Sequence, residues 1–91
     1  EAALITHDAV LEAAVVGRED QDALQKPMAF VVLKPGRQAD EDLRRELQQH
    51  VKARLAPYKY PRWIEFLAEL PKTATGKIQR FKLRHAAARQ G

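Results

Sequence analysis

Residues 28–33 read Met-Ala-Phe-Val-Val-Leu, an uninterrupted run of apolar side chains. A run of this length, with aromatic and β-branched members, is typical of a buried β-strand. A second strand is predicted at residues 10–17, where the adjacent Val15 and Val16 favour a pleated surface and Gly17 permits a turn. We expect the two strands to pair antiparallel across a polar loop of about ten residues that includes residues 18–22. A loop longer than a tight hairpin needs is a candidate binding element.

A helix is predicted after the Lys-Pro-Gly-Arg turn at residues 34–37. Its sign is a set of aliphatic side chains spaced four residues apart: Leu43, Leu47, Val51 and Leu55. This spacing makes one apolar stripe, and the acidic residues 40–42 suit a helix N-terminus. Pro57 marks the end of the helix. We assign the stripe to the core, because the strands need a layer to cover them.

A third strand is predicted at residues 62–67, where side chains alternate between two faces. One face would carry Trp63, Glu65 and Leu67, and the other Arg62, Ile64 and Phe66. A strand, a crossover helix and another strand usually run parallel with a right-handed connection, so this strand should lie parallel to residues 28–33. The predicted fold class is α+β, a small three-stranded mixed β-sheet flanked by helices.

Both ends of the sequence are predicted to be helical. Residues 1–6 read as the end of an amphipathic helix whose Leu4 and Ile5 pack inward. From Arg80 onward, apolar residues flanked by lysine and arginine predict a basic C-terminal helix. There are no internal repeats and no low-complexity linker, so residues 1–91 are predicted to form one domain.

The 91 residues carry a net charge of +4 that is unevenly distributed. Residues 1–70 hold ten Lys or Arg and twelve Asp or Glu, whereas residues 71–91 hold six Lys or Arg and no acid. A local positive potential concentrates anions, which suits a nucleotide, CoA or a nucleic acid equally. A solvated basic helix at a chain end would produce the same pattern.

Several classes of protein are disfavoured by the composition. The sequence has no cysteine, and its histidines, His7, His50 and His85, are far apart, so we expect no metal site. No apolar run has the length of a membrane span, and no signal segment opens the chain. We expect a soluble, cytoplasmic protein. Because Glu1 opens directly into a helical pattern, we also expect a piece of a longer chain.

A turn near the C-terminus presents one lysine. In residues 70–80, LPKTATGKIQR, Gly76 supplies backbone freedom and lets another molecule approach beside Lys77. The hydroxyls of Thr73 and Thr75 can bond to the backbone or to a ligand oxygen.

This turn does not match a Walker A phosphate loop. That loop would need a glycine at position 71 and a Ser or Thr after the lysine, where this chain has Pro71 and Ile78.

Residues 70–84, LPKTATGKIQRFKLR, closely resemble the last signature motif of the adenylate-forming enzymes, the superfamily of acyl-CoA synthetases, peptide-synthetase adenylation domains and luciferases. The resemblance covers almost the whole chain, and residues 56–66, APYKYPRWIEF, with residues 12–20, EAAVVGRED, look most like the benzoate–CoA ligases. It implies the C-terminal lid domain of an aryl- or acyl-CoA ligase that makes benzoyl-CoA, AMP and diphosphate from benzoate, ATP and CoA. The hinge and the N-terminal domain would lie before Glu1.

The resemblance also implies roles for individual residues. Lys77 would be the catalytic lysine, which bridges the carboxylate and the nucleotide oxygens in the adenylation step only. Thr75 and Gly76 would be substrate-binding positions that shape the loop beside it. In a rotated pose that forms the thioester, CoA would be bound by Tyr58, Lys59 and Arg62.

The same resemblance implies the cofactors and partners. ATP, CoA and Mg²⁺ would be bound mainly by the N-terminal domain of the same chain, together with a small-molecule carboxylate. Members of the family are switched off by acetylation of the motif lysine, so a lysine acetyltransferase and a deacetylase are further candidate partners. We expect neither a nucleic-acid nor a membrane partner.

Two alternatives stay open from the sequence. The domain could be the lid of another adenylate-forming enzyme, such as a peptide-synthetase domain that docks a carrier, since these enzymes share the fold. It could also be a small basic nucleic-acid-binding module, although it lacks helix-turn-helix spacing, zinc ligands and interleaved aromatics on a sheet face.

Overall fold

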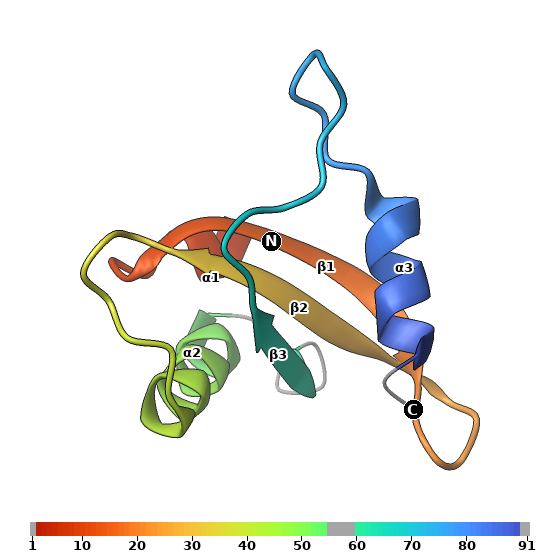
Figure 1. The fold of residues 1–91 in the computed structure, drawn as a ribbon. Coiled ribbons are helices and arrows are strands. Elements are labelled where there is room, and N and C mark those ends of the chain that lie inside the picture. The colour runs from red at the N-terminus through yellow and green to blue at the C-terminus, as the bar shows by residue number, and fades with distance from the viewer. Residues whose placement is uncertain (1, 55–59, 90–91) are drawn as a thin grey trace.

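The computed structural model describes residues 2–54 and 60–89. Its elements are the helices α1 (Ala2–Ile5), α2 (Glu41–Arg54) and α3 (Arg80–Arg89) and the strands β1 (Val10–Glu19), β2 (Gln25–Leu33) and β3 (Trp63–Phe66). The strands form one three-stranded sheet in the order β1-β2-β3, with β1 antiparallel and β3 parallel to β2 (Figure 1). The predicted α+β class, a small mixed sheet flanked by helices, is confirmed.

The turn between β1 and β2 is shorter than the sequence pattern predicted. The strands stay paired as far as Glu19 and Gln25, so only residues 20–24 form the turn. The Asp20 carboxylate accepts hydrogen bonds from two backbone N–H groups inside the turn, at 2.9 and 3.1 Å. The prediction of a loop of about ten residues was wrong, because this local bonding closes the turn tightly and lets both strands extend.

The sheet is covered on both faces, and each face has its own hydrophobic core. On one face Leu47 of α2 packs with Val31 of β2 and Ile64 of β3. On the other face α3 packs against β1, and its Leu83 joins a cluster with Phe30 of β2. Helices α2 and α3 therefore lie on opposite sides of the sheet (Figure 1).

Strand β3 alternates between these two cores as predicted. Ile64 and Phe66 belong to the α2 side, whereas Trp63 and the following Leu67 pack on the α3 side. The alternation fixes which side chains of this segment face which helix.

Helix α2 begins after Asp40, whose carboxylate accepts a hydrogen bond from the Leu43 N–H at 2.8 Å. Such a cap satisfies a donor that the first helical turn leaves without an intrahelical partner. The predicted apolar stripe is buried at Leu43, Leu47 and Val51, whereas Leu55 lies outside the described residues. The stripe is part of the core, as expected.

Helix α1 is a single turn that buries only one large side chain. Leu4 is buried, but Ile5 is 50% exposed, so the prediction that both pack inward was wrong for Ile5. A helix of four residues presents a narrow face to α2 and β1, and Leu4 occupies it. Within residues 2–54 and 60–89, no helix is long and apolar enough to cross a membrane.

Candidate functional site

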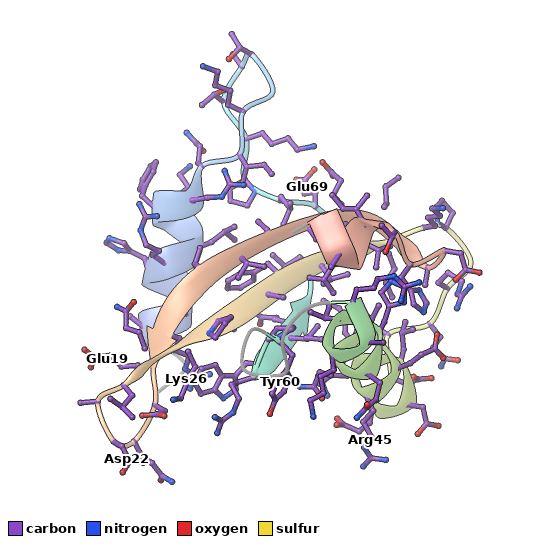
Figure 2. All side chains as sticks on the ribbon, turned by 180° about the vertical axis from the view of Figure 1, so that it is seen from behind. Glu19, Asp22, Lys26, Arg45, Tyr60 and Glu69 are labelled. Atoms are coloured by element: carbon purple, nitrogen blue, oxygen red, sulfur yellow. The ribbon has the colours of Figure 1, made fainter. Side chains whose placement is uncertain are left out.

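The lysine-bearing turn is a β-hairpin formed by residues 71–79, called the lysine hairpin below. Its two arms meet at an antiparallel bridge between Lys72 and Ile78. Closer to the sheet, the Gln79 N–H donates a hydrogen bond to the Pro71 carbonyl at 2.8 Å. The hairpin projects away from the rest of the molecule, and the β1–β2 turn with Glu19 and Asp22 lies at the opposite end (Figures 1 and 2).

The tip of the lysine hairpin is a tight loop closed by backbone hydrogen bonds. The Thr73 N–H donates to the Lys77 carbonyl at 2.8 Å, and the Gly76 N–H donates to the Thr73 carbonyl at 2.9 Å. Gly76 has a φ of +89°, the left-handed conformation with which three-residue hairpin loops commonly end. Glycine therefore supplies the backbone freedom expected from the sequence, because a Cβ would be strained there.

Both threonine hydroxyls of the tip bond locally, as predicted. Thr73 Oγ1 accepts a hydrogen bond from the Lys77 N–H at 3.1 Å and lies 3.0 Å from Thr75 Oγ1. These bonds fix the backbone of Lys77 on both sides of its Cα. The site residues Thr75, Gly76 and Lys77 are therefore held together in one ordered loop.

The two lysines of the hairpin differ in their surroundings. Lys72 forms an ion pair with Glu12 of β1. Lys77 is exposed, and no carboxylate among the described residues pairs with it. The hairpin thus presents one ammonium group that is available to an anion from outside the domain.

Arg62 lies at the opposite end of β3 from the lysine hairpin. Its backbone N–H donates to the Pro27 carbonyl at 2.9 Å, beside the paired ends of β1 and β2, and its side chain is exposed. From there β3 runs away from the β1–β2 turn, and the chain reaches the lysine hairpin only after leaving the strand (Figure 1). The structure does not bring Arg62 and Lys77 together.

Arg62 lines a surface hollow of about 460 Å³ beside the β1–β2 turn. Trp63 also lines it, and the Arg18 guanidinium lies 4.4 Å from the centre of the Trp63 ring. The pKa of Asp20, another lining residue, is held below its usual range, mainly by the hydrogen bond from the Leu24 N–H, with smaller contributions from neighbouring cations. The hollow combines an aromatic face with charges of both signs.

The other two residues predicted to bind CoA, Tyr58 and Lys59, lie outside the described residues. The next residue, Tyr60, is partly buried, and the Lys52 Nζ of α2 lies 4.2 Å from the centre of its ring. This contact attaches the start of the β3 segment to α2.

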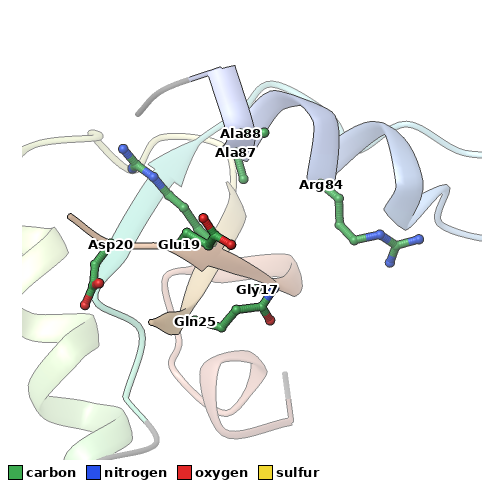
Figure 3. Close-up of a pocket in the computed structure, with 8 residues that line it drawn as sticks. Gly17, Glu19, Asp20, Gln25, Arg84, Ala87 and Ala88 are labelled. Carbon is green, nitrogen blue, oxygen red and sulfur yellow. The ribbon is translucent and has the colours of Figure 1, made fainter. Parts of the chain in front are cut away.

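Sequence reasoning did not foresee a second hollow, of about 430 Å³, between the β1–β2 turn and α3. Figure 3 shows Ala87 and Ala88 of α3 above the strand ends that carry Gly17 and Gln25. The small residues of its lining are Gly17 on the strand side and Ala87 and Ala88 on the helix side, and they gave no specific signal in the sequence. The sequence also did not predict that Trp63 lines the hollow beside Arg62. The alternation of side chains in this segment identified Trp63 only as a strand residue.

Comparison with known proteins identifies the class to which this fold and hairpin belong. The model of the AMP-binding enzyme C-terminal domain family matches residues 1–77, and the chain belongs to this family. The match ends at the lysine of the hairpin. The resemblance to the adenylate-forming enzymes is confirmed.

Among individual proteins, the chain is 73% identical over 86 residues to the benzoate–CoA ligase of Thauera aromatica. The matched region covers 94% of this chain and 16% of the relative. It is 52% identical over 85 residues to the 4-hydroxybenzoate–CoA/benzoate–CoA ligase of Rhodopseudomonas palustris, covering 92% of this chain and 16% of the relative. A crystal structure of the anthranilate CoA ligase AuaEII in complex with anthranoyl-AMP matches with a TM-score of 0.92 and 57% identity, over 99% of this chain and 17% of that one. The chain therefore spans about a sixth of the length of these relatives.

Proposed function

We propose that this chain is the C-terminal lid of an ATP-dependent acid–thiol ligase that converts benzoate, ATP and CoA to benzoyl-CoA, AMP and diphosphate. The observation that carries the proposal is the ordered hairpin that presents Lys77 without a carboxylate partner among the described residues. The similarity to aryl-CoA ligases supports an aromatic acid as the substrate. It also favours the CoA-ligase branch over a carrier-docking lid or a nucleic-acid-binding module.

Lys77 would act by electrostatics during adenylation. The carboxylate of the acid must approach the α-phosphate of ATP, and both groups are anionic. An ammonium on a long side chain that reaches between them offsets their repulsion and stabilises the charge that develops as pyrophosphate leaves. It needs no proton transfer for this role, so the required property is a positive charge at a fixed position.

Thr75 and Gly76 would shape the loop that holds the Lys77 ammonium in place. Gly76 has φ +89°, and no heavy atom lies within 4 Å of the place where a Cβ would stand. The open side of Gly76 lets a nucleotide approach the hairpin closely. The Thr75 hydroxyl, which already bonds to Thr73, could also donate to a phosphate oxygen.

CoA would be bound at the other end of the domain, by Tyr58, Lys59 and Arg62. The exposed Arg62 suits a phosphate, and the Trp63 ring beside it suits an adenine base. The separation of Arg62 from Lys77 supports a lid that uses two surfaces in turn. Adenylation would use the hairpin end, and a rotation of the domain would then bring the Arg62 end to the active site.

ATP and Mg²⁺ would be held mainly by an N-terminal domain of the same chain, in the cytoplasm. The lysine hairpin does not fit a Mg²⁺ site, because residues 71–79 contain ammonium groups and hydroxyls but no carboxylate. The acid-free segment 71–91 would instead contribute positive potential to the cleft between the domains.

Lys77 would also be a target of a lysine acetyltransferase, and a deacetylase would reverse the modification. The exposed side chain is flanked by small residues that do not shield it. Acetylation removes the charge on which the bridging role depends, so adenylation should fall as occupancy rises while thioester formation is kept. Mass spectrometry of Lys77 occupancy and assays of both half-reactions on the same samples test this. Adenylation that is independent of occupancy would rule it out.

The test of the proposed function is benzoate-dependent ATP–pyrophosphate exchange and benzoyl-CoA formation by the intact enzyme, measured beside a panel of aliphatic acids. The isolated 91-residue domain should show neither activity. Arg62→Ala should raise the KM for CoA and leave pyrophosphate exchange unchanged, and the exposed Arg45 of α2 provides a matched Arg→Ala control. Exchange with no aromatic acid, or exchange by the isolated domain, would contradict the proposal.

A further inference from the structure

An ion pair between Lys72 and Glu12 joins the lysine hairpin to the sheet. Lys72 lies in the bridge at the base of the hairpin, and Glu12 lies on β1. Their side chains are 36% and 30% exposed, so both groups are partly withdrawn from water. The pair connects two segments that are about sixty residues apart in the sequence.

Glu12 faces the hairpin because of an irregularity in β1. The pairing with β2 shifts between Val10, opposite Leu33, and Glu12, opposite Val32. Val10 belongs to the core on the α2 side, and Leu11 is 52% exposed. A strict alternation would put Glu12 on the same face as Val10, whereas the extra residue of a bulge turns it to the other face.

The face that Glu12 reaches is the one from which the hairpin leaves the sheet. Ala14 and Val16, which follow Glu12 at alternate positions, belong to the core on the α3 side. Leu70 and Ile78, at the two ends of the hairpin base, pack against that same core. The bulge therefore lets β1 bury Val10 on the α2 side and direct the Glu12 carboxylate toward the hairpin on the α3 side.

The other attachments that the structure gives for the hairpin are backbone hydrogen bonds and apolar contacts. Among the described residues, its backbone hydrogen bonds are internal, apart from the one that the Lys82 N–H donates to the Gln79 carbonyl. The contacts of Leu70 and Ile78 are apolar, and such contacts have no directional preference. The ion pair joins strand β1 to Lys72. Lys72 is bridged to Ile78, and Ile78 directly follows Lys77.

We propose that Glu12 and Lys72 are positioning residues for Lys77: their ion pair orients the lysine hairpin and so places the Lys77 ammonium during adenylation. This inference rests on the proposed function. The pair also neutralises the second cation of the hairpin, which leaves one net charge at its tip. A partly exposed pair adds little to stability, but a small displacement of a catalytic group reduces a rate strongly, so the effect should appear in catalysis rather than in folding.

The test uses the intact enzyme with Glu12→Gln and, separately, Lys72→Met. Each variant should lower kcat for benzoate-dependent pyrophosphate exchange about 10-fold, with the KM for benzoate and the melting temperature nearly unchanged. Transfer of the acyl group from pre-made benzoyl-adenylate to CoA should keep the wild-type rate. Asp42→Asn, which removes the carboxylate of an exposed pair with Arg45 on α2, is the matched control and should leave both half-reactions unchanged.

Rescue separates positioning from a general structural role. The charge-swapped double variant Glu12→Lys with Lys72→Glu should recover most of the adenylation rate, because the pair is restored in reverse. Wild-type exchange in both single variants, equal losses in both half-reactions, or no recovery in the double variant would overturn the inference. Lys77→Ala, measured alongside, tests the proposed function separately: if it lowers adenylation while Glu12→Gln does not, only the positioning inference fails.

Discussion

The Thr73 hydroxyl accepts a hydrogen bond from the Lys77 N–H at 3.1 Å, while the Thr73 N–H donates to the Lys77 carbonyl at 2.8 Å. Threonine at position 73 thus bonds to both backbone polar groups of the lysine that we propose to be catalytic. Within the loop, the backbone of Lys77 is therefore held at both its N–H and its carbonyl. The loop resembles a preorganised site, in which a charge is held ready before the reacting groups arrive.

Removal of the Thr73 hydroxyl should therefore weaken adenylation without unfolding the domain. Thr73→Val leaves the Lys77 N–H without its side-chain acceptor, and one hydrogen bond of this kind contributes about 1 kcal/mol, or roughly 5-fold in rate. Thr73→Ser keeps the hydroxyl and should retain most of the activity. Pyrophosphate exchange by the two variants measures the difference. Equal rates for Val and Ser would show that the hydroxyl does not support the site.

Gly76→Ala isolates the backbone conformation of the loop. Gly76 has φ +89° and open space around it, so a Cβ meets no atom and the cost, about 1 kcal/mol, is that of the left-handed conformation alone. Gly36→Ala is a matched control, because Gly36 has φ +86° and equally open surroundings. Urea unfolding should show similar losses of stability for both variants. Only Gly76→Ala should also lower pyrophosphate exchange, and an equal effect of both variants on exchange would exclude a specific role of the Gly76 conformation in adenylation.

His50 should make the domain less stable in acid. The Thr6 hydroxyl donates to the Ala3 carbonyl at 2.6 Å, so His50 Nε2–H must donate to Thr6 Oγ1 at 2.7 Å. His50 Nδ1 is then left to accept from Arg54 at 3.1 Å. The neutral ring fits these partners, because a second proton on Nδ1 would point at the Arg54 guanidinium.

The pKa of His50 is accordingly lowered, first by partial burial and then by the charges of Arg54 and His7, although the Ala3 carbonyl and Glu46 act in the opposite direction. The unfolded chain, with an ordinary pKa of 6.5, then binds a proton more readily than the folded one. Stability should therefore fall as the pH drops through this value, until the folded-state pKa is passed. Urea unfolding between pH 8 and pH 5 measures the slope, and His50→Gln should reduce it. An unchanged slope in this variant would exclude His50 as the source.

The domain should fold on its own, because its sheet is covered on both faces by its own helices. Leu47 is fully buried between α2 and the sheet, so Leu47→Ala should cost about 2–5 kcal/mol of unfolding free energy. Leu24 is 55% exposed in the β1–β2 turn, and Leu24→Ala should cost under about 1 kcal/mol. Far-UV circular dichroism during urea unfolding of residues 1–91 provides both values. A non-cooperative transition of the unmodified domain would contradict an independent fold.

The parts of the fold that the sequence predicted correctly depend on local signals. Residues 28–33 are apolar throughout because β2 is the central strand and is covered on both faces, and the stripe of α2 follows from helical spacing. The turn that carries Lys77 was recognisable because it needs glycine and small polar residues at fixed positions, although its hairpin pairing was not predicted.

The parts that were not predictable depend on contacts between distant segments. The pair of Glu12 and Lys72 exists because a bulge changes the face of one side chain, which alternation in the sequence does not reveal. The exposure of Ile5 reflects how little of a one-turn helix can reach the core. The distance between Arg62 and Lys77 along the molecule follows from the direction of β3, which is a property of the assembled sheet.

The role of Lys77 is tested most directly by comparing the two half-reactions in the intact enzyme carrying Lys77→Ala. One preorganised charged donor typically contributes about 10²–10³ in rate, so benzoate-dependent pyrophosphate exchange should fall by at least that factor. Lys82→Ala, which removes an exposed lysine from α3, is the matched control and should leave exchange unchanged. Transfer from pre-made benzoyl-adenylate to CoA should remain near the wild-type rate in both variants. Equal losses of exchange and transfer in Lys77→Ala, or no loss of exchange, would contradict the assignment of Lys77 to the adenylation step.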